Sequence, residues 1–210
     1  MTVLPFGERA LLVELGDKID EGMAERSRAI ADAWEALGHG PAVPAYASVL
    51  LTFDPLRLTP DRAEVMAREV AGLGSHRASG PHAPRTVVIP TIYDGPDLAD
   101  VAARSSLSPD ELVELHTART YRAFFLGFLP GYAYCGMLDP RIVAPRLADP
   151  RVRLPAGSVG VAAGQTAVYP FESPGGWRLI GRTAERLWDP AAERPARIRA
   201  GDLVRFVRVE

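Results

Sequence analysis

The spacing of apolar residues predicts two helices and four short strands in the first part of the chain. Met23, Ile30, Trp34 and Leu37 recur near the helical period. The predicted helices span residues 19–37 and 60–73, and the predicted strands span residues 2–5, 10–15, 43–46 and 48–53. Two helices over one four-stranded antiparallel sheet make a two-layer α+β domain.

A change of composition then predicts a boundary between two domains. Residues 74–84, GSHRASGPHAP, are small and polar and have no apolar period, which is typical of a linker. The predicted domains are therefore residues 1–84 and residues 85–210.

The second domain is predicted to be mainly β. A strand at 85–93 and helices at 96–105 and 108–117 come first, and Ser108 and Glu111 have the spacing of a capping box. From Tyr121 onward, short apolar runs alternate with glycine and proline to the end of the sequence. Many short strands with frequent turns favour a barrel or a sandwich.

The stretch YPFESPGGWRLIGRT, residues 169–183, allows two interpretations. Pro174-Gly175-Gly176 is turn chemistry between flanks with strand character, so a plain hairpin is the simpler interpretation. The alternative is a loop whose backbone approaches a ligand closely, because glycine has no side chain to prevent it.

Composition and charge exclude several classes of function. The chain is 47% hydrophobic and 24% charged, as expected of a globular protein with a core. Its net charge of -2 gives no electrostatic case for binding nucleic acid or an anionic membrane. The only lysine, Lys18, lies in Gly-Asp-Lys-Ile, so the sequence has no phosphate loop of the Walker type.

Cysteine content and hydropathy predict a cytoplasmic protein. A lone cysteine, Cys135, excludes an intrachain disulfide and fits a reducing compartment. No apolar run has the length of a membrane span, and the first residues lack the pattern of a secretory signal. We therefore expect neither a membrane nor a nucleic acid as partner.

His116 and Glu172 are the best candidates for acid–base chemistry. His116 lies one helical step from Leu112 and Val113, so a packed histidine on a helix face is the competing and commoner explanation. Glu172 precedes the Ser-Pro-Gly-Gly turn, where a purely structural carboxylate has little reason to lie. The four histidines have no paired ligand spacing, so no metal is expected, and Cys135 is interpreted as a small buried residue.

Two further segments have either a binding or a structural interpretation. The run LGFLPGY, residues 126–132, is typical of a pocket wall with exposed amides and aromatic surface, or of a kinked barrel corner. Residues 139–153 carry four arginines on a proline-rich segment, which suits carboxylate or phosphate recognition. A solvated loop with arginine–aspartate pairs is the slightly favoured alternative. Gln165 either places an amide over a ligand or begins a strand.

Three long motifs carry a resemblance to a known family. FLGFLPGYAYCGMLDPR, RLPAGSVGVAAGQTAVYPFESPGGWRLIGRT and the closing GDLVRF resemble the family that includes KipI, the B subunit of 5-oxoprolinase, and allophanate hydrolase subunit 1. The resemblance extends to GERALLVELGD and LTFDP near the N-terminus. It implies a cyclophilin-like β-barrel as the second domain, and it favours a turn at a functional pocket over the plain hairpin.

The resemblance also implies a function within an assembly. Members act as the B subunit of a 5-oxoprolinase, a hydrolase complex that opens 5-oxoproline to L-glutamate with hydrolysis of ATP. The implied partners are a homologue of the C subunit, of the KipA or allophanate hydrolase subunit 2 type, and a homologue of the A subunit, of the LamB/YcsF type. ATP is then used by the complex and need not bind this chain, which we expect to be inactive alone. The alternatives are inhibition of a sensor histidine kinase and a role in the carboxyltransferase part of a urea carboxylase.

Together with strand geometry, the resemblance predicts one shared concave site for a small-molecule substrate. In it, Glu172 and His116 are expected to be catalytic, and Arg182 to pair with the substrate carboxylate. The residues expected to bind substrate are Gln165, Arg182, Trp177, Phe128, Gly175 and Gly176.

Overall fold

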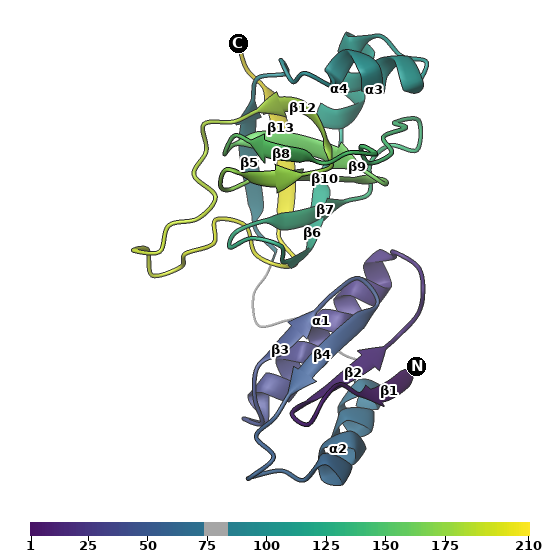
Figure 1. The fold of residues 1–210 in the computed structure, drawn as a ribbon, viewed down its shortest axis with the longest axis vertical. Coiled ribbons are helices and arrows are strands. Elements are labelled where there is room, and N and C mark those ends of the chain that lie inside the picture. The colour runs from purple at the N-terminus through teal and green to yellow at the C-terminus, as the bar shows by residue number, and fades with distance from the viewer. Residues whose placement is uncertain (74–83) are drawn as a thin grey trace. The chain divides into compact units, whose positions relative to one another are not determined.

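The computed structural model describes residues 1–73 and 84–210 of the chain. The chain divides into two compact units, Met1–Ala83 and Pro84–Glu210. Figure 1 shows the course of each unit. The segment predicted as a linker lies outside the described residues, except for Pro84. No helix within the described ranges is long and apolar enough to cross a membrane.

The first unit is a four-stranded antiparallel sheet with two helices, as predicted. Its elements are β1 (Thr2–Pro5), β2 (Ala10–Glu14), α1 (Glu21–Ala36), β3 (Ala42–Pro44), β4 (Ser48–Thr52) and α2 (Pro60–Leu73). The strands lie in the order β1-β2-β4-β3. Helix α1 starts where the Asp20 side chain accepts a 3.0 Å hydrogen bond from the Met23 amide, which caps one unpaired N–H.

Strand alternation places the core of this unit on one face of the sheet. Leu11 and Val13 of β2 and Val49 and Leu51 of β4 are buried against the helices, while their neighbours along each strand are more exposed. Trp34 of α1 is fully buried, and its indole N–H donates to the Thr52 carbonyl at 2.9 Å. One layer of helices on one face of the sheet therefore gives the unit a single core.

The second unit is a nearly closed, barrel-like mixed sheet. Its elements are β5 (Thr86–Thr91), α3 (Leu98–Arg104), α4 (Pro109–Thr117), β6 (Tyr121–Leu126), β7 (Ala133–Gly136), β8 (Arg151–Leu154), β9 (Ser158–Ala162), β10 (Gln165–Val168), β11 (Ser173–Gly175), β12 (Arg178–Arg182) and β13 (Leu203–Arg208). Seven strands lie in the order β12-β9-β10-β7-β6-β13-β5, and β11 and β8 form a separate ribbon. Ile92, just after β5, exchanges two backbone hydrogen bonds of 2.8 and 2.9 Å with Arg182 of β12. This bridge joins the two edges of the sheet.

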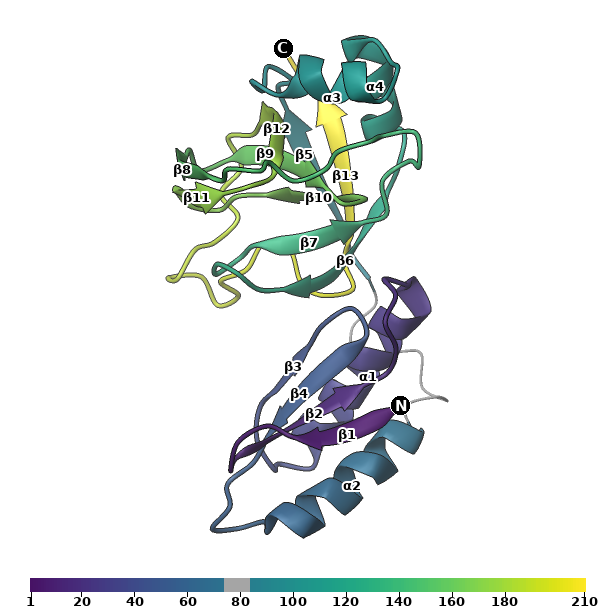
Figure 2. The same cartoon turned by 45° about the vertical axis from the view of Figure 1, so that its right-hand side comes forward.

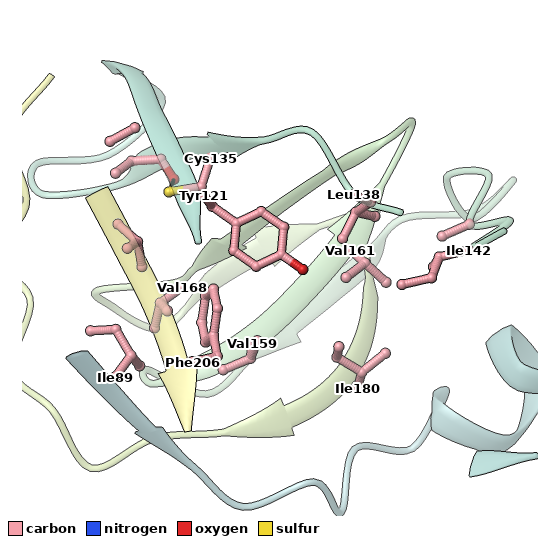
Figure 3. Packing of buried hydrophobic residues seen from close by; sticks show 14 of the residues in the cluster. Ile89, Tyr121, Cys135, Leu138, Ile142, Val159, Val161, Val168, Ile180 and Phe206 are labelled. Atoms are coloured by element: carbon pink, nitrogen blue, oxygen red, sulfur yellow. Dashed lines mark hydrogen bonds between the residues drawn. The ribbon is translucent and has the colours of Figure 1, made fainter. Parts of the chain in front are cut away.

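Helices α3 and α4 lie together at one end of this sheet (Figures 1 and 2). The predicted capping box at the start of α4 is confirmed, because Ser108 and Glu111 each accept a hydrogen bond from the other's backbone amide. The core beneath contains Tyr121 of β6 and Phe206 of β13 among aliphatic side chains (Figure 3). Cys135 is buried in the same core, as interpreted from the sequence.

Of the two interpretations of residues 169–183, the plain hairpin is wrong. Strands β10 and β12 both pair with β9, one on each side, so the flanks of the turn do not pair with each other. Ser173–Gly175 instead forms β11, which pairs with β8. The Pro-Gly-Gly stretch therefore crosses over β9 and contributes to a ribbon beside the barrel. This arrangement leaves its glycines next to a pocket.

Candidate functional site

A pocket of about 240 Å³ lies in the second unit, beside the β8–β11 ribbon. It is lined by Phe128, Tyr132, Tyr134, Arg146, Pro150, Tyr169, Pro174, Gly175, Gly176 and Trp177. These residues come from the turn between β6 and β7, from β7, from the segment before β8, and from the stretch around β11. The glycine-rich run and the arginine-bearing segment of the sequence thus meet at one place.

Aromatic rings form the walls of the pocket. The Tyr132 ring is the centre of the group, with centroids 4.9 Å from Tyr134, 5.1 Å from Tyr169 and 6.0 Å from Trp177. All three pairs are edge-to-face, an arrangement that aromatic quadrupoles favour. Mutual packing fixes these rings before any ligand binds.

Phe128 lies at the pocket in a strained conformation. Its backbone has φ of 68°, in the left-handed region that costs a residue with a side chain roughly 1–3 kcal/mol. The residue is 57% exposed, yet its ring lies edge-to-face on Tyr132 at a centroid distance of 5.4 Å. Because so much of the ring stays in water, its own burial contributes little to offset the strain. Strain held at an exposed aromatic residue points to a role in binding.

Gly175 and Gly176 differ in what surrounds them. A Cβ on Gly175 would lie 2.6 Å from Leu154 Cδ2 and 2.7 Å from the Tyr169 hydroxyl oxygen, so no side chain fits without displacing the pocket wall. A Cβ on Gly176 would meet nothing closer than Pro150 Cγ at 3.6 Å, an ordinary contact. The close backbone approach therefore belongs to Gly175, and the groups that it approaches are the side chains of Leu154 and Tyr169.

The Tyr169 hydroxyl lies beside the Tyr132 hydroxyl and the Trp177 backbone, whose hydrogen bonding acts against the burial that raises the pKa of Tyr169. Burial raises the pKa of both Tyr132 and Tyr169, so both stay protonated at neutral pH.

Arg146 provides the positive charge of the pocket. Arg146 is exposed. Burial raises the pKa of Tyr134 and of Tyr169, and the positive charge of Arg146 acts in the opposite direction on both. The guanidinium therefore lies close enough to interact with both phenols. The other arginines of its segment have carboxylate partners: Arg141 with Asp139 at 2.9 Å, Arg151 with Asp97 at 2.7 Å, and Arg153 with Glu172 at 2.7 Å. The interpretation as a loop with paired arginines therefore holds for these three, and the recognition interpretation remains a prediction for Arg146.

Four of the eight predicted site residues line this pocket: Phe128, Trp177, Gly175 and Gly176. Of the residues predicted to share one surface, the pocket brings these four together, and the other four do not line it. Glu172 pairs with Arg153 and Arg182 pairs with Asp94 at 2.8 Å, each with more than half of its side chain exposed. Both charges are matched outside the pocket lining, so the geometry does not support their proposed roles.

His116 and Gln165 are buried in the barrel. The His116 side chain is inaccessible to solvent, and burial lowers its pKa to about 3. Its Nδ1 lies 2.7 Å from the Tyr93 hydroxyl and its Nε2 lies 2.9 Å from Thr166 Oγ1. Thr166 in turn donates its single proton to the Gly160 carbonyl at 3.2 Å. Nε2 therefore carries the histidine proton, and Nδ1 accepts from Tyr93.

This arrangement supports the packed-histidine explanation for His116. A neutral imidazole with both nitrogens satisfied by protein groups has no free position for a substrate. Gln165 is buried, and its Nε2 has no hydrogen-bond partner among the described residues. Its backbone pairs with Gly136 and Ala162, as expected of the strand start that the sequence allowed. Within the same part of the chain, no three His, Cys, Asp or Glu side chains gather as a metal site.

Several residues that line the pocket were not among the site residues predicted from the sequence. Tyr132, Tyr134 and Tyr169 appeared only as letters in longer motifs, and Arg146 only as one of four arginines. The sequence holds one signal for Arg146. Arg141 and Arg151 each have an aspartate two residues before them, whereas Arg146 and Arg153 have no acidic residue within two positions. That signal leaves Arg146 and Arg153 as candidates for an unpaired arginine. It cannot decide between them, because the ion pair of Arg153 with Glu172, like that of Arg151 with Asp97, joins residues distant in sequence.

Comparisons with known proteins agree over most of the chain. The family model for the carboxyltransferase domain, subdomain C and D, matches residues 1–198. The 5-oxoprolinase B subunit of Bacillus subtilis (strain 168) is 36% identical over 218 residues, which cover 97% of this chain and 91% of that protein. The 5-oxoprolinase B subunit of Escherichia coli O157:H7 is 51% identical over 126 residues, 59% of this chain and 58% of that protein.

Solved structures extend the likeness to the fold. The crystal structure of TTHA0988 has a TM-score of 0.83 and 36% identity, and the match covers 96% of this chain but only 40% of that one. The urea carboxylase of Kluyveromyces lactis has a TM-score of 0.77 at 18% identity, over 99% of this chain and 22% of that chain. At that identity the second likeness concerns the fold alone.

Proposed function

The chain belongs to the carboxyltransferase-domain family, subdomain C and D, and we propose that it acts as the B subunit of an ATP-dependent 5-oxoprolinase. The complex would open the ring amide of 5-oxoproline with water to give L-glutamate. The observation that carries this proposal is the near full-length likeness to a protein named as the B subunit of 5-oxoprolinase. The aromatic pocket adds support, because its volume suits a small molecule.

We further propose that hydrolysis of ATP takes place on the partners, the homologues of the A and C subunits. The pocket is poorly suited to a nucleoside triphosphate. Its volume is about 240 Å³, and its lining holds one arginine and no lysine to pair with the charge of three phosphates. The chain also has no phosphate loop around its only lysine. In this proposal the chain binds and orients a substrate in the cytoplasm, and its partners supply the phosphate chemistry.

The same proposal covers the domain architecture. We take residues 1–84 and 85–210 as the two domains and the second as a cyclophilin-like barrel. The division into two compact units and the seven-stranded, nearly closed sheet support this. The likeness of fold to a urea carboxylase is compatible with a related carboxyltransferase role, but its identity of 18% carries no argument about activity.

Reconstitution tests the function directly. The purified chain is assayed for 5-oxoproline-dependent ATP hydrolysis and glutamate release, alone and mixed with the homologues of the A and C subunits, with each component omitted in turn. We expect turnover only when all three are present. Robust turnover by the chain alone would contradict the need for partners. Inactivity of the full mixture, together with stoichiometric inhibition of a sensor histidine kinase, would favour the inhibitor role instead.

A further inference from the structure

We propose that the aromatic pocket binds a small cyclic carboxylate, with the Arg146 guanidinium holding the carboxylate and the rings of Tyr132 and Trp177 packing against its ring. The choice of 5-oxoproline as the natural ligand rests on the proposed function, whereas the ligand class follows from the pocket itself. This assigns the carboxylate contact to Arg146, in place of Arg182.

Size limits the ligand to a small metabolite. Pockets for drug-sized ligands enclose roughly 300–1,000 Å³. The cavity here, at about 240 Å³, lies below that range and suits a single small ring with its substituents.

Charge selects an anion. The described residues that line the pocket include Arg146 and no acidic side chain. No ion pair for Arg146 is recorded in residues 1–73 and 84–210, while its neighbours Arg141, Arg151 and Arg153 are all paired. A planar guanidinium matches a carboxylate with two parallel hydrogen bonds. Tyr169 lines the same pocket and stays protonated, so its hydroxyl can donate to the same anion.

The position of Arg146 is fixed by its backbone neighbours, although the segment has no regular structure. The Ala144 carbonyl accepts from the Ala163 amide at 2.8 Å, and the Pro145 carbonyl accepts from Arg178 Nε at 2.9 Å. The Leu147 amide donates to the Gly176 carbonyl at 2.8 Å. Arg146 is thus held between anchored residues and beside the Gly175–Gly176 stretch. A binding group held in place before the ligand arrives loses less entropy on binding.

The shape of the walls selects a ring. Tyr132, Tyr169 and Trp177 pack edge-to-face among themselves, so their arrangement is set without a ligand. A compact, saturated or planar ring fills such a space and displaces water from the aromatic surface. A carboxylate without a ring, such as acetate, would pair with Arg146 but would not displace water from the aromatic rings.

Calorimetric titration of the full chain without partners tests the ligand class. The probes are 5-oxoproline, cyclopentanecarboxylate, 2-pyrrolidinone, which has the ring amide without the carboxylate, and acetate. We expect both cyclic carboxylates to bind at least tenfold more tightly than 2-pyrrolidinone and than acetate. Equal binding of 2-pyrrolidinone, or no binding of either cyclic carboxylate at millimolar concentrations, would overturn the proposal.

Two arginine variants locate the contact. Arg146→Gln should weaken binding of the cyclic carboxylates roughly 10- to 100-fold, as expected for losing a hydrogen-bonded charge, and leave the weak binding of 2-pyrrolidinone unchanged. Arg141→Gln makes the same change of charge on the same segment and should leave binding as in the unmodified chain. Equal losses in the two variants would overturn the assignment to Arg146.

Failure of this proposal can be distinguished from failure of the proposed function. Turnover by the reconstituted complex, with no carboxylate binding by the chain alone, would refute the pocket and leave the function standing. Arg146-dependent binding by the chain, with an inactive complex, would support the pocket and refute the function.

Discussion

The second unit contains two groups of tyrosines, each around one basic side chain, and the two groups have opposite characters. His116 lies between Tyr93 and Tyr121 in the core, where every nitrogen of the imidazole has a protein partner. Arg146 lies near Tyr134 and Tyr169 at the surface, where the guanidinium is exposed. The first group is closed to solvent, and the second is open to a ligand.

The two groups show that solvent access, and not a perturbed pKa, identifies a candidate ligand site. Burial lowers the pKa of His116 to about 3, yet both ring nitrogens already have hydrogen-bond partners within the protein. The Arg146 site is identified by geometry: an exposed cation, fixed rings and a cavity. A perturbed pKa indicates function only where the group can reach a substrate. The histidine group should therefore govern stability, and the arginine group should govern binding.

The largest expected effect is the loss of His116. His116→Ala removes the acceptor of the Tyr93 hydroxyl and leaves a cavity in the core, so it should lower the free energy of unfolding by about 3–5 kcal/mol. Urea denaturation at neutral pH measures this. Glu114→Ala, an exposed change on the same helix, should stay within about 0.5 kcal/mol of the parent chain. A His116→Ala chain with parental stability and no activity in the complex would instead make His116 catalytic.

The next effect is the dependence of that stability on pH. The folded-state pKa of His116, about 3, lies below the usual value of 6.5, so the unfolded chain binds a proton that the folded chain does not. Stability from the neutral imidazole is therefore present above pH 6.5 and is lost as pH falls from 6.5 toward 3. The slope approaches about 1.4 kcal/mol per pH unit.

Comparison of the parent chain with His116→Ala isolates this contribution from that of the carboxylates. The stability difference between the two chains should narrow by about 2 kcal/mol from pH 7 to pH 5. A difference that stays constant over this range would contradict a buried, neutral His116.

The helices and the capping box could be predicted from the sequence because their signals are local. The helical period around Ile30 and Trp34, the proline at the start of α2 and the capping box at Ser108 each depend on a few adjacent residues. The hairpin prediction failed because turn chemistry is local, whereas strand pairing is not. Nothing near Pro174 indicates that β9, earlier in the chain, lies between the two flanks.

The site was predictable only in part for the same reason. Gly175, Gly176 and Trp177 are adjacent in sequence, so their shared location followed from that proximity, whereas Phe128 was joined to them only by the resemblance. Which charged side chains remain available depends on long-range partners. Arg182 is paired by Asp94 and Arg153 by Glu172, and only the folded chain brings those pairs together.

The smallest expected change in stability is at Phe128, and it separates the two groups most sharply. Glycine adopts φ near 68° without strain, so Phe128→Gly removes roughly 1–3 kcal/mol of backbone strain and adds about 0.5–1 kcal/mol of unfolded-state entropy. With little apolar area lost, the free energy of unfolding should stay the same or rise by about 1 kcal/mol. Binding of cyclic carboxylates should nevertheless weaken severalfold, because one wall of the pocket is gone.

Val143→Gly is the matched control for this last change, since Val143 is also an exposed apolar residue but has no left-handed backbone and does not line the pocket. It should cost about 0.5–1 kcal/mol of stability and leave binding unchanged. Urea denaturation and calorimetry on both variants give the two readouts. If Phe128→Gly loses stability and keeps binding, as expected of Val143→Gly, then the strain at Phe128 has no connection with the ligand. Binding would then depend on Arg146 and not on Phe128. If it gains stability and loses binding, the strained backbone holds the ring where a ligand needs it.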